Sequence, residues 1–267
     1  MNNDQISRIF LYNLINLKVY VRSVTAVLVA VSLAGCAATQ TPSVADPTDP
    51  FEATNRQVHA FNKGLDTFAV RPASQVYGTV IPGPVRTGIS NFADNLGLPA
   101  VIINNSLQGD LESAASNTGR FLVNLTFGIG GFLDPSTALG VQEESTDFGE
   151  TLHVWGAGEG AYLELPFFGP STTRDAAGRA VDILIDPLGY VLDVPEINYS
   201  RGSSIASGLN SRFRFSGTID GILYDSADSY AQSRIIYLQN RRFELGTSSP
   251  TSALDTESDI YDDLFLE

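Results

Sequence analysis

Residues 121–140 read FLVNLTFGIGGFLDPSTALG, and this stretch decides how the rest of the chain is interpreted. It begins as the end of an amphipathic helix and becomes a loop that is both apolar and glycine-rich. Loops are normally polar and run over the protein surface. An apolar loop from Phe127 to Gly140 therefore needs a cover, which is the protein's own core, a partner protein or lipid.

The segment before this loop predicts a helix from Leu111 to Phe127. Apolar and small residues recur at spacings of three and four, which places them on one face. Asp110 is expected to cap the start of this helix. Arg120 and Asn124 lie one turn apart, so they face the same way, on another side of the helix.

The loop itself is interpreted as a re-entrant hairpin or as a buried connection. Its glycines, Gly128, Gly130 and Gly131, lie between Phe127 and Phe132, and an Asp134-Pro135 turn signal follows. Glycine permits backbone freedom, so a hairpin here is able to flex. Apolar, non-helical backbone at membrane depth is tolerated only when it packs on protein or lines a water-filled cavity.

The rest of the chain predicts an all-α fold, because strand-like alternation is scarce. A helix from Phe51 to Leu65, begun by an Asp49 cap and Pro50, carries a stripe that is partly amide and partly apolar, through Asn55, Phe61 and Asn62. Further helices are expected at 72–80, 84–96, 100–107, 148–155, 174–182, 205–215, 219–224 and 230–245, with breaks at Arg71-Pro72 and at Gly97 and Pro99. A flexible turn is expected at 156–161 and an aromatic, proline-bounded loop at 165–170.

The first residues predict a targeting segment, residues 1–35, that precedes the folded domain. Three basic residues come before a thirteen-residue uncharged run, which is too short to span a bilayer and suits a secretory signal. The run ends at Leu33-Ala34-Gly35-Cys36, which resembles a bacterial lipobox. Cys36 is the only cysteine and the expected site of lipidation. The alternative is an ordinary signal peptide with an incidental cysteine. Ala37, the next residue, is typical of lipoproteins sorted to the outer membrane.

Three further segments are expected after the signal peptide: a tether at 36–48, a helical domain at 49–245 and a disordered acidic tail at 246–267. Without the first 35 residues the chain carries 13 basic and 29 acidic residues, a net charge of −16. This charge argues against nucleic acid as a partner and against electrostatic adhesion to anionic lipid. Entry into a bilayer would have to rest on apolar contact.

The sequence offers little catalytic chemistry. His59 and His153 lack metal-ligand partners at a useful spacing, and no serine-hydrolase elbow occurs. The segment 156–161, GAGEGA, matches the dinucleotide-binding pattern, yet no convincing strand precedes it and no helix follows. We therefore expect no enzyme activity and no cofactor.

A series of short motifs resembles the MlaA (VacJ) family of outer-membrane lipoproteins. The resemblance runs in order from Asp49 to Asp186 and is looser afterwards. Its pieces are DPFE at 49–52, Asn55-Arg56, Phe61-Asn62, Arg71-Pro72, PVR at 84–86, Asn91-Phe92, LQGD at 107–110, Arg120-Phe121, Asn124, GIGGF at 128–132, Asp134, DFG at 147–149, Leu152, Leu165-Pro166, GPS at 169–171 and Arg174-Asp175.

This resemblance implies a ring-like helical protein in the inner, periplasmic leaflet of the outer membrane, with a membrane-embedded hairpin. Such a protein would remove phospholipid from the outer leaflet through an amphipathic channel and pass it to a periplasmic phospholipid-carrier protein. It would sit beside a trimeric porin and maintain lipid asymmetry. The residues expected to form the channel or gating hairpin are Asn55, Phe61, Asn62, Arg120, Asn124, Phe127, Gly128, Gly130, Gly131 and Phe132.

Two alternatives remain open from the sequence. One is a structural lipoprotein that braces a porin or the envelope without lipid transfer, and the other is an envelope hydrolase. For Arg120, contact with a lipid phosphate, a helix-capping role and a salt bridge within the protein are all open. We expect Gly130→Ala and Gly131→Ala, or a deletion near Phe61-Asn62, to alter lipid transport while the protein still reaches the membrane; unchanged outer-leaflet phospholipid would contradict gating.

Overall fold

The computed structural model describes residues 49–194 and 196–247, which belong to one compact unit, Thr48–Glu267. The predicted signal peptide, lipidation site Cys36 and tether lie outside these ranges, as does the acidic tail from residue 248 onward.

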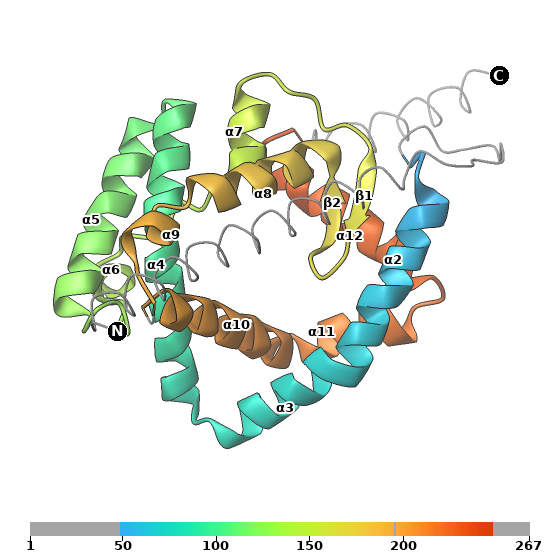
Figure 1. The fold of residues 1–267 in the computed structure, drawn as a ribbon, viewed down its shortest axis with the longest axis horizontal. Coiled ribbons are helices and arrows are strands. Elements are labelled where there is room, and N and C mark those ends of the chain that lie inside the picture. The colour runs from blue at the N-terminus through green and yellow to red at the C-terminus, as the bar shows by residue number, and fades with distance from the viewer. Residues whose placement is uncertain (1–48, 195, 248–267) are drawn as a thin grey trace, which may run out of the picture. The chain divides into compact units, whose positions relative to one another are not determined.

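Helices dominate the described residues, and a two-stranded antiparallel sheet is the only sheet among them (Figure 1). The elements are α2 (Glu52–Leu65), the π-helix η2 (Asp66–Val70), α3 (Arg71–Val80), α4 (Gly83–Gln108), α5 (Leu111–Phe127), α6 (Pro135–Ala138), α7 (Phe148–Val154), β1 (Tyr162–Leu165), β2 (Gly169–Thr172), α8 (Thr173–Ile185), α9 (Leu188–Val191), α10 (Glu196–Arg214), α11 (Ser216–Asp220), the π-helix η3 (Gly221–Asp225) and α12 (Ser229–Glu244).

Within this unit the elements close into a ring. α2 continues through η2 into α3, which packs on α10, and α10 packs on α4. α4 contacts α7, α7 contacts α8, α8 contacts the β1–β2 sheet, and β1 returns to α2. Figure 1 shows these elements arranged around a central opening, with α5 on the outer side of α4. The ring-like, all-α prediction is therefore confirmed.

Side-chain caps explain where several helices begin. A carboxylate or hydroxyl oxygen accepts a hydrogen bond from the backbone N–H three residues further on, which satisfies one of the free donors of the first turn. The capping residues are Asp110 for α5, Asp134 for α6, Asp147 for α7, Thr172 for α8 and Asp228 for α12.

The prediction for Asp49 was wrong, because Phe51 occupies the N-cap of α2. Asp49 is buried instead, where it accepts hydrogen bonds from Asn55 and from the hydroxyl of Tyr230.

The predicted break at Gly97 and Pro99 was also wrong, because α4 runs unbroken from Gly83 to Gln108 with Pro99 inside it. Proline removes one helical hydrogen bond and normally kinks or ends a helix. Here α4 packs on α5, α7 and α10 along its length, so tertiary contacts outweigh the local cost.

The β1–β2 hairpin was missed. Its strands have four residues each, Tyr162 pairs with Thr172, and a Pro166-Phe167-Phe168 turn joins them. In β1, Tyr162 and the charged Glu164 are the buried residues. Apolar side chains therefore do not alternate as in an ordinary half-buried strand, which is why the pattern gave no signal.

Two other boundaries differ from the sequence-based expectation. The Arg71-Pro72 break is a π-helical turn that joins α2 to α3 without interruption, since Pro72 falls in the first turn of α3 where its missing N–H costs little. The helix predicted at 205–215 starts earlier, at Glu196, although its first turns are rich in serine and glycine.

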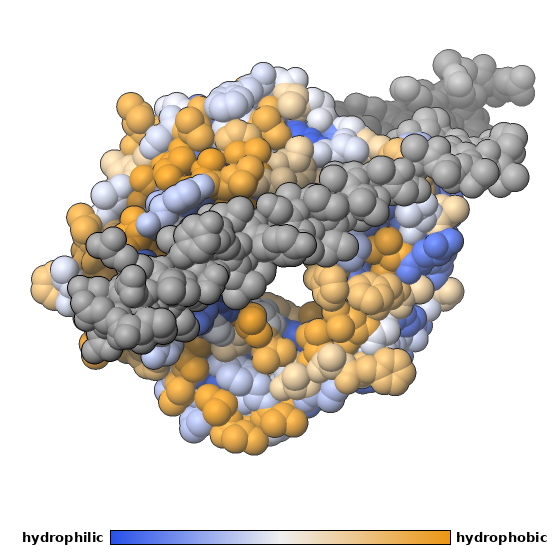
Figure 2. All heavy atoms as spheres, viewed as in Figure 1, coloured by the Kyte–Doolittle hydropathy of each residue, from blue (hydrophilic) through white to orange (hydrophobic). Residues whose placement is uncertain are grey.

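The distribution of polar and apolar side chains is inverted relative to a water-soluble protein. Among the described residues, five hydrophobic side chains are buried and twenty-one polar or charged ones are. Twenty-nine large hydrophobic side chains are exposed, and Figure 2 shows hydrophobic residues spread over the visible face. Soluble monomers rarely expose more than a few hundred Å² of contiguous apolar surface.

Buried polar contacts, rather than an apolar core, hold the ring elements together. The apolar cluster of Tyr162, Tyr230 and Leu238 joins β1 to α12 only. Arg212 of α10 forms a two-pronged ion pair with Asp66 of η2, at 2.8 Å for both contacts. Asp175 of α8 similarly accepts from Tyr237 of α12 at 2.6 Å.

Candidate functional site

The hairpin after α5 is a tight left-handed turn. Ile129, Gly130 and Gly131 have φ angles of 56°, 71° and 96°. The turn caps α5, because the N–H of Gly131 donates to the Asn124 carbonyl at 2.9 Å and that of Gly130 to the Leu125 carbonyl at 3.1 Å. A further bond, from the Leu133 N–H to the Gly128 carbonyl at 2.8 Å, closes the turn itself. A positive φ is normal for glycine but costly for a β-branched residue such as Ile129. Such strain is retained mainly at functional segments.

A buried arginine anchors the hairpin to α5. Arg120 is 7% exposed and donates to Asp134 at 2.6 Å, to Thr137 and to the Val141 carbonyl. Asn124 donates to Asp134 at 3.0 Å. Burial alone would raise the pKa of Asp134, but the hydrogen bonds from Thr137, Arg120 and Asn124 lower it overall. Arg120 thus forms a salt bridge within the protein, and its contact with a lipid phosphate stays a prediction.

The hairpin is also fixed by close packing against α4. A Cβ added to Gly88 would lie 2.2 Å from the ring of Phe132, so Phe132 occupies the space that glycine leaves. A Cβ on Gly131 would lie 2.7 Å from the Asn95 side chain. Glycine at these two positions is therefore a requirement of the docked hairpin.

The outer side of the hairpin is apolar and exposed. Phe127, Ile129 and Leu139 are 77%, 75% and 73% exposed. α5 continues this surface, because its apolar residues Leu122 and Leu125 point outward while Asn117, Arg120 and Asn124 are buried. The predicted helix is correct to the residue, and its polar side is the buried one.

A second aromatic loop lies at the central opening. The β1–β2 turn exposes Phe167 and Phe168, and Figure 2 shows a gap through the ring between this turn and α10. Asn62 of α2 holds the turn through hydrogen bonds to the Leu165 carbonyl and from the Phe167 N–H, at 2.9 and 2.8 Å. Phe61 contacts Phe167 edge to face, with ring centroids 5.3 Å apart.

Asn55 belongs to a buried network beneath the same hairpin. Its amide donates to Asp49 and to the Tyr162 carbonyl, and its oxygen accepts from the Glu164 N–H. Glu164 in turn accepts from the Tyr162 hydroxyl and contacts His59 at 3.2 Å. Asn55 is 2% exposed, so its polar groups serve the protein's own fold in this structure.

A small polar cavity of about 20 Å³ separates α4, α5 and the residues after the hairpin. Both polar atoms of the buried Asn95 side chain face it without a hydrogen-bond partner. Partial burial, and then the neighbouring charge of Asp94, raise the pKa of the Glu143 carboxyl. The space suffices for one water molecule, which Asn95 could bind.

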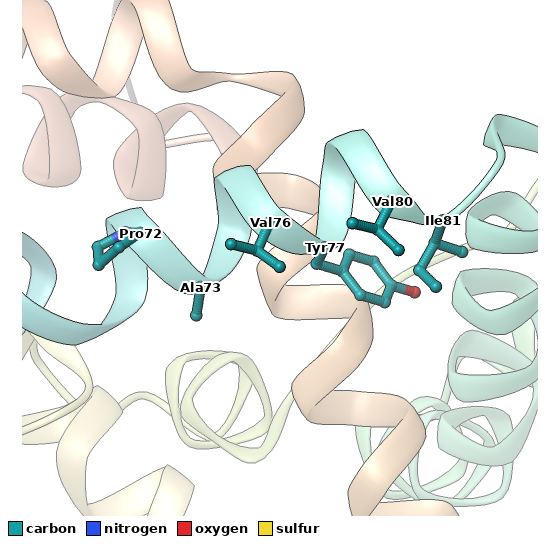
Figure 3. Close-up of a pocket in the computed structure, with 6 residues that line it drawn as sticks. All are labelled: Pro72, Ala73, Val76, Tyr77, Val80 and Ile81. Carbon is teal, nitrogen blue, oxygen red and sulfur yellow. The ribbon is translucent and has the colours of Figure 1, made fainter.

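An apolar groove of about 480 Å³ runs along α3 (Figure 3). Ser74 and Gly78 form the buried face of α3, and Gly78 meets Phe213 of α10. The groove lies on the remaining faces of the helix, where Val76 and Val80 are 62% and 68% exposed. It is lined by Pro72, Ala73, Val76, Tyr77, Val80 and Ile81.

The structure thus brings the predicted site residues into two groups. Arg120, Asn124 and residues 127–132 form the hairpin and its anchor. Asn55, Phe61 and Asn62 support the β1–β2 hairpin. Whether either group contacts a ligand stays a prediction.

Sequence reasoning missed Asp134, Asn95 and Glu164 as positioning residues. A capping Asp before Pro135 was the available signal for the first, and isolated polar residues on apolar helices give none for the others. In the described part of the chain, no set of His, Cys, Asp and Glu side chains is grouped to hold a metal ion. Likewise, none of its helices is long and apolar enough to cross a membrane.

A helical ring with buried polar joints and an apolar exterior defines a class of protein built for an apolar surrounding. The family model for the MlaA lipoprotein matches residues 47–244, and the chain belongs to this family.

Individual relatives agree with this assignment. The chain is 36% identical over 215 residues to the intermembrane phospholipid transport system lipoprotein MlaA of Escherichia coli (strain K12), covering 79% of this chain and 83% of that one. The protein of the same name from Haemophilus influenzae is 28% identical over 249 residues, covering 91% and 96%. A solved structure described as "Structural basis for maintenance of bacterial outer membrane lipid asymmetry" superimposes with a TM-score of 0.64 at 33% identity, covering 74% of this chain and 98% of that chain.

Proposed function

We propose that this protein is an outer-membrane lipoprotein that removes phospholipid from the outer leaflet and hands it to a periplasmic carrier protein. It acts without catalysis, so the lipid leaves chemically unchanged. The proposal rests on membership of a family whose named members belong to an intermembrane phospholipid transport system. We also propose that the protein is lipidated at Cys36, lies in the periplasmic leaflet and sits beside a trimeric porin.

The inverted packing is the observation that carries the proposal. Exposed side chains such as Phe127, Val76 and Ile205 gain nothing from water, whereas acyl chains would cover them. Burial of one such side chain is worth about 1.5–3 kcal/mol. Lipid around the ring would therefore supply the stabilisation that the small apolar cluster does not.

The central gap supports a path for the lipid through the ring. Its rim includes the aromatic β1–β2 turn, which Asn62 and Phe61 hold in place. We propose that this turn and the hairpin of residues 127–140 control entry to the path. The strained Ile129 and the positive-φ glycines make the hairpin of residues 127–140 the segment best suited to change conformation.

Lipid transfer from vesicles tests this function directly. The full lipoprotein is reconstituted into vesicles that contain a labelled phospholipid, and a purified periplasmic carrier is added. We expect intact labelled lipid on the re-isolated carrier, well above the amount from protein-free vesicles. An envelope-bracing lipoprotein would give equal amounts, and a hydrolase would give lysolipid or free headgroup.

A further inference from the structure

A polar depression of about 390 Å³ lies apart from the two loops described above. The loop after α7, the start of α8 and the end of α12 form its walls. Its lining residues are His153, Gly156, Ala157, Gly158, Glu159, Arg174, Arg242, Leu245 and Thr247.

Basic side chains outnumber acidic ones along the lining of this depression, although the chain as a whole is acidic. The whole protein has a net charge of −14, yet the depression is lined by two arginines and a histidine against a single carboxylate, Glu159. Arg242 already pairs with Glu159 through two contacts of 2.8 and 2.9 Å. The carboxylate partner of Arg174, Asp175, does not line the depression.

Arg174 is held in place with one nitrogen left over. Its side chain is 3% exposed, and Nε donates to Asp175 at 3.2 Å while Nη1 donates to Nδ1 of His153 at 3.4 Å. Nη2 is buried and has no hydrogen-bond partner. An unpaired buried donor of a charged group costs more than a neutral one, so a missing acceptor is expected here.

His153 adds a second donor to the same depression. Arginine can only donate, so Nδ1 of His153 accepts the bond from Arg174, and the proton of the neutral ring lies on Nε2. The wall beside it is the loop of Gly156, Ala157 and Gly158, in which Gly156 has a φ of +91°. A glycine-rich wall lets a ligand approach the backbone and lets the loop shift to uncover Nη2.

We propose that this depression binds a phosphate group, with Arg174, His153 and Arg242 as its donors. The three donors come from α8, α7 and α12, and a tetrahedral anion offers enough oxygens to accept from all three at once. A phospholipid headgroup and free phosphate share this chemistry. Assignment to the headgroup rests on the proposed function, whereas the phosphate site itself does not.

The site can be tested on the full lipoprotein in a phosphate-free detergent. Trp155, the only tryptophan, adjoins Gly156 and reports binding through its fluorescence, with calorimetry as a second measurement. The probes are sodium phosphate, sodium chloride at equal ionic strength, dihexanoyl phosphatidylglycerol, and dihexanoylglycerol, which has the same tails without phosphate.

Three variants separate a binding role from a structural one. We expect Arg174→Gln to weaken phosphate binding by about tenfold or more, the usual effect of losing a charge-assisted hydrogen bond. Glu159→Gln frees Arg242 and should tighten binding, which damage to the fold would not do. Arg179→Gln, on the same helix but over the Phe168 ring, is the matched control and should leave affinity unchanged.

The outcomes are distinguishable from those of the transfer assay. If dihexanoyl phosphatidylglycerol binds more tightly than phosphate and competes with it, the ligand is a phospholipid headgroup. Equal affinities of the two probes support free phosphate as the ligand. Absence of saturable binding by both phosphate probes, or weaker binding in Glu159→Gln, overturns the site. If Arg174→Gln does not fold, the site is still decided by Glu159→Gln, which should tighten phosphate binding, and by Arg242→Gln, which removes one of the three donors and should weaken it. Phosphate binding by a protein that transfers no lipid would refute the proposed function alone.

Discussion

Single buried polar residues hold the elements of this ring together, as apolar residues do in the core of a water-soluble protein. Arg120 is the clearest example, because it joins α5 to Asp134, Thr137 and Val141 in one contact set. Removing one partner of such a buried pair leaves the other charge unpaired. The strength of the hairpin anchor is therefore measurable at one residue.

We expect Arg120→Gln to destabilise the protein by about 3 kcal/mol, the lower end for a broken buried ion pair, because the Asp134 side chain is 21% exposed. Chemical denaturation in detergent measures the loss. The double variant with Asp134→Asn should recover part of it, since no uncompensated charge then remains. A double variant that is additive would show that the two residues are not coupled.

Glu143 gives a prediction about pH. Burial and the charge of Asp94 raise its pKa in the folded protein, so the folded state binds that proton more tightly than the unfolded chain does. Its contribution to stability is present below the unfolded pKa, about 4.3, and is lost as pH rises through the higher folded value.

Accordingly, Glu143→Gln should raise the Tm at pH 7 and leave it nearly unchanged at pH 4. Thermal unfolding in detergent at the two pH values measures this, with the exposed neighbour variant Glu144→Gln as the control. An equal change in Tm at both pH values would argue against titration of Glu143 as the cause.

At the scale of elements, the docking of the hairpin depends on one notch in α4, which is the space that Gly88 leaves for the Phe132 ring. Gly88→Ala places a methyl group 2.2 Å from the Phe132 ring, and such overpacking costs about 1–3 kcal/mol. Gly97→Ala on the same helix meets no atom within 4 Å and should stabilise it by about 1 kcal/mol.

We therefore expect Gly88→Ala to undock the hairpin, and Gly97→Ala to leave it docked. Faster amide exchange at residues 128–133 in the first variant alone would show this. If the hairpin also controls lipid entry, the rate of transfer to the carrier should change in Gly88→Ala and not in Gly97→Ala. Unchanged exchange in both variants would contradict the role of the notch.

The elements that the sequence predicts well are those with local signals. α5 is correct at both ends, because the Asp110 cap and the glycines after Phe127 mark them. α4 could not be predicted as one helix, because its contacts beyond Pro99 come from residues far away in sequence, such as those of Asn104 with Thr151 and Asp182. The β1–β2 hairpin escaped notice because Glu164 faces inward, where Tyr162 of the same strand and the distant His59 and Asn62 contact its carboxylate.

At the scale of the whole molecule, amphipathic patterns in the sequence show that each helix has an apolar and a polar face. They do not show which of the two faces points into the protein. Leu122 and Leu125 would point inward in water and point outward here. The same limit applies to the candidate site, since Arg120 and Asn124 were correctly placed together while their partners were not evident. A surrounding of lipid reverses the usual sorting, so the medium has to be known before the pattern can be oriented.

This inversion predicts that the folded domain holds to membranes without the acyl chains proposed at Cys36. We expect a Cys36→Ser variant, exported with a cleavable signal peptide, to remain in the membrane fraction and to require detergent for extraction. Exposed residues such as Phe127, Ile129 and Leu139 each contribute about 1.5–3 kcal/mol on transfer to lipid, so several of them together exceed the marginal binding that one acyl chain gives.

Replacing these three residues by serine in the Cys36→Ser background should release a large part of the protein, because the hairpin surface is then polar. A Cys36→Ser protein that is fully soluble and monomeric in buffer would show that the apolar exterior is not covered by lipid.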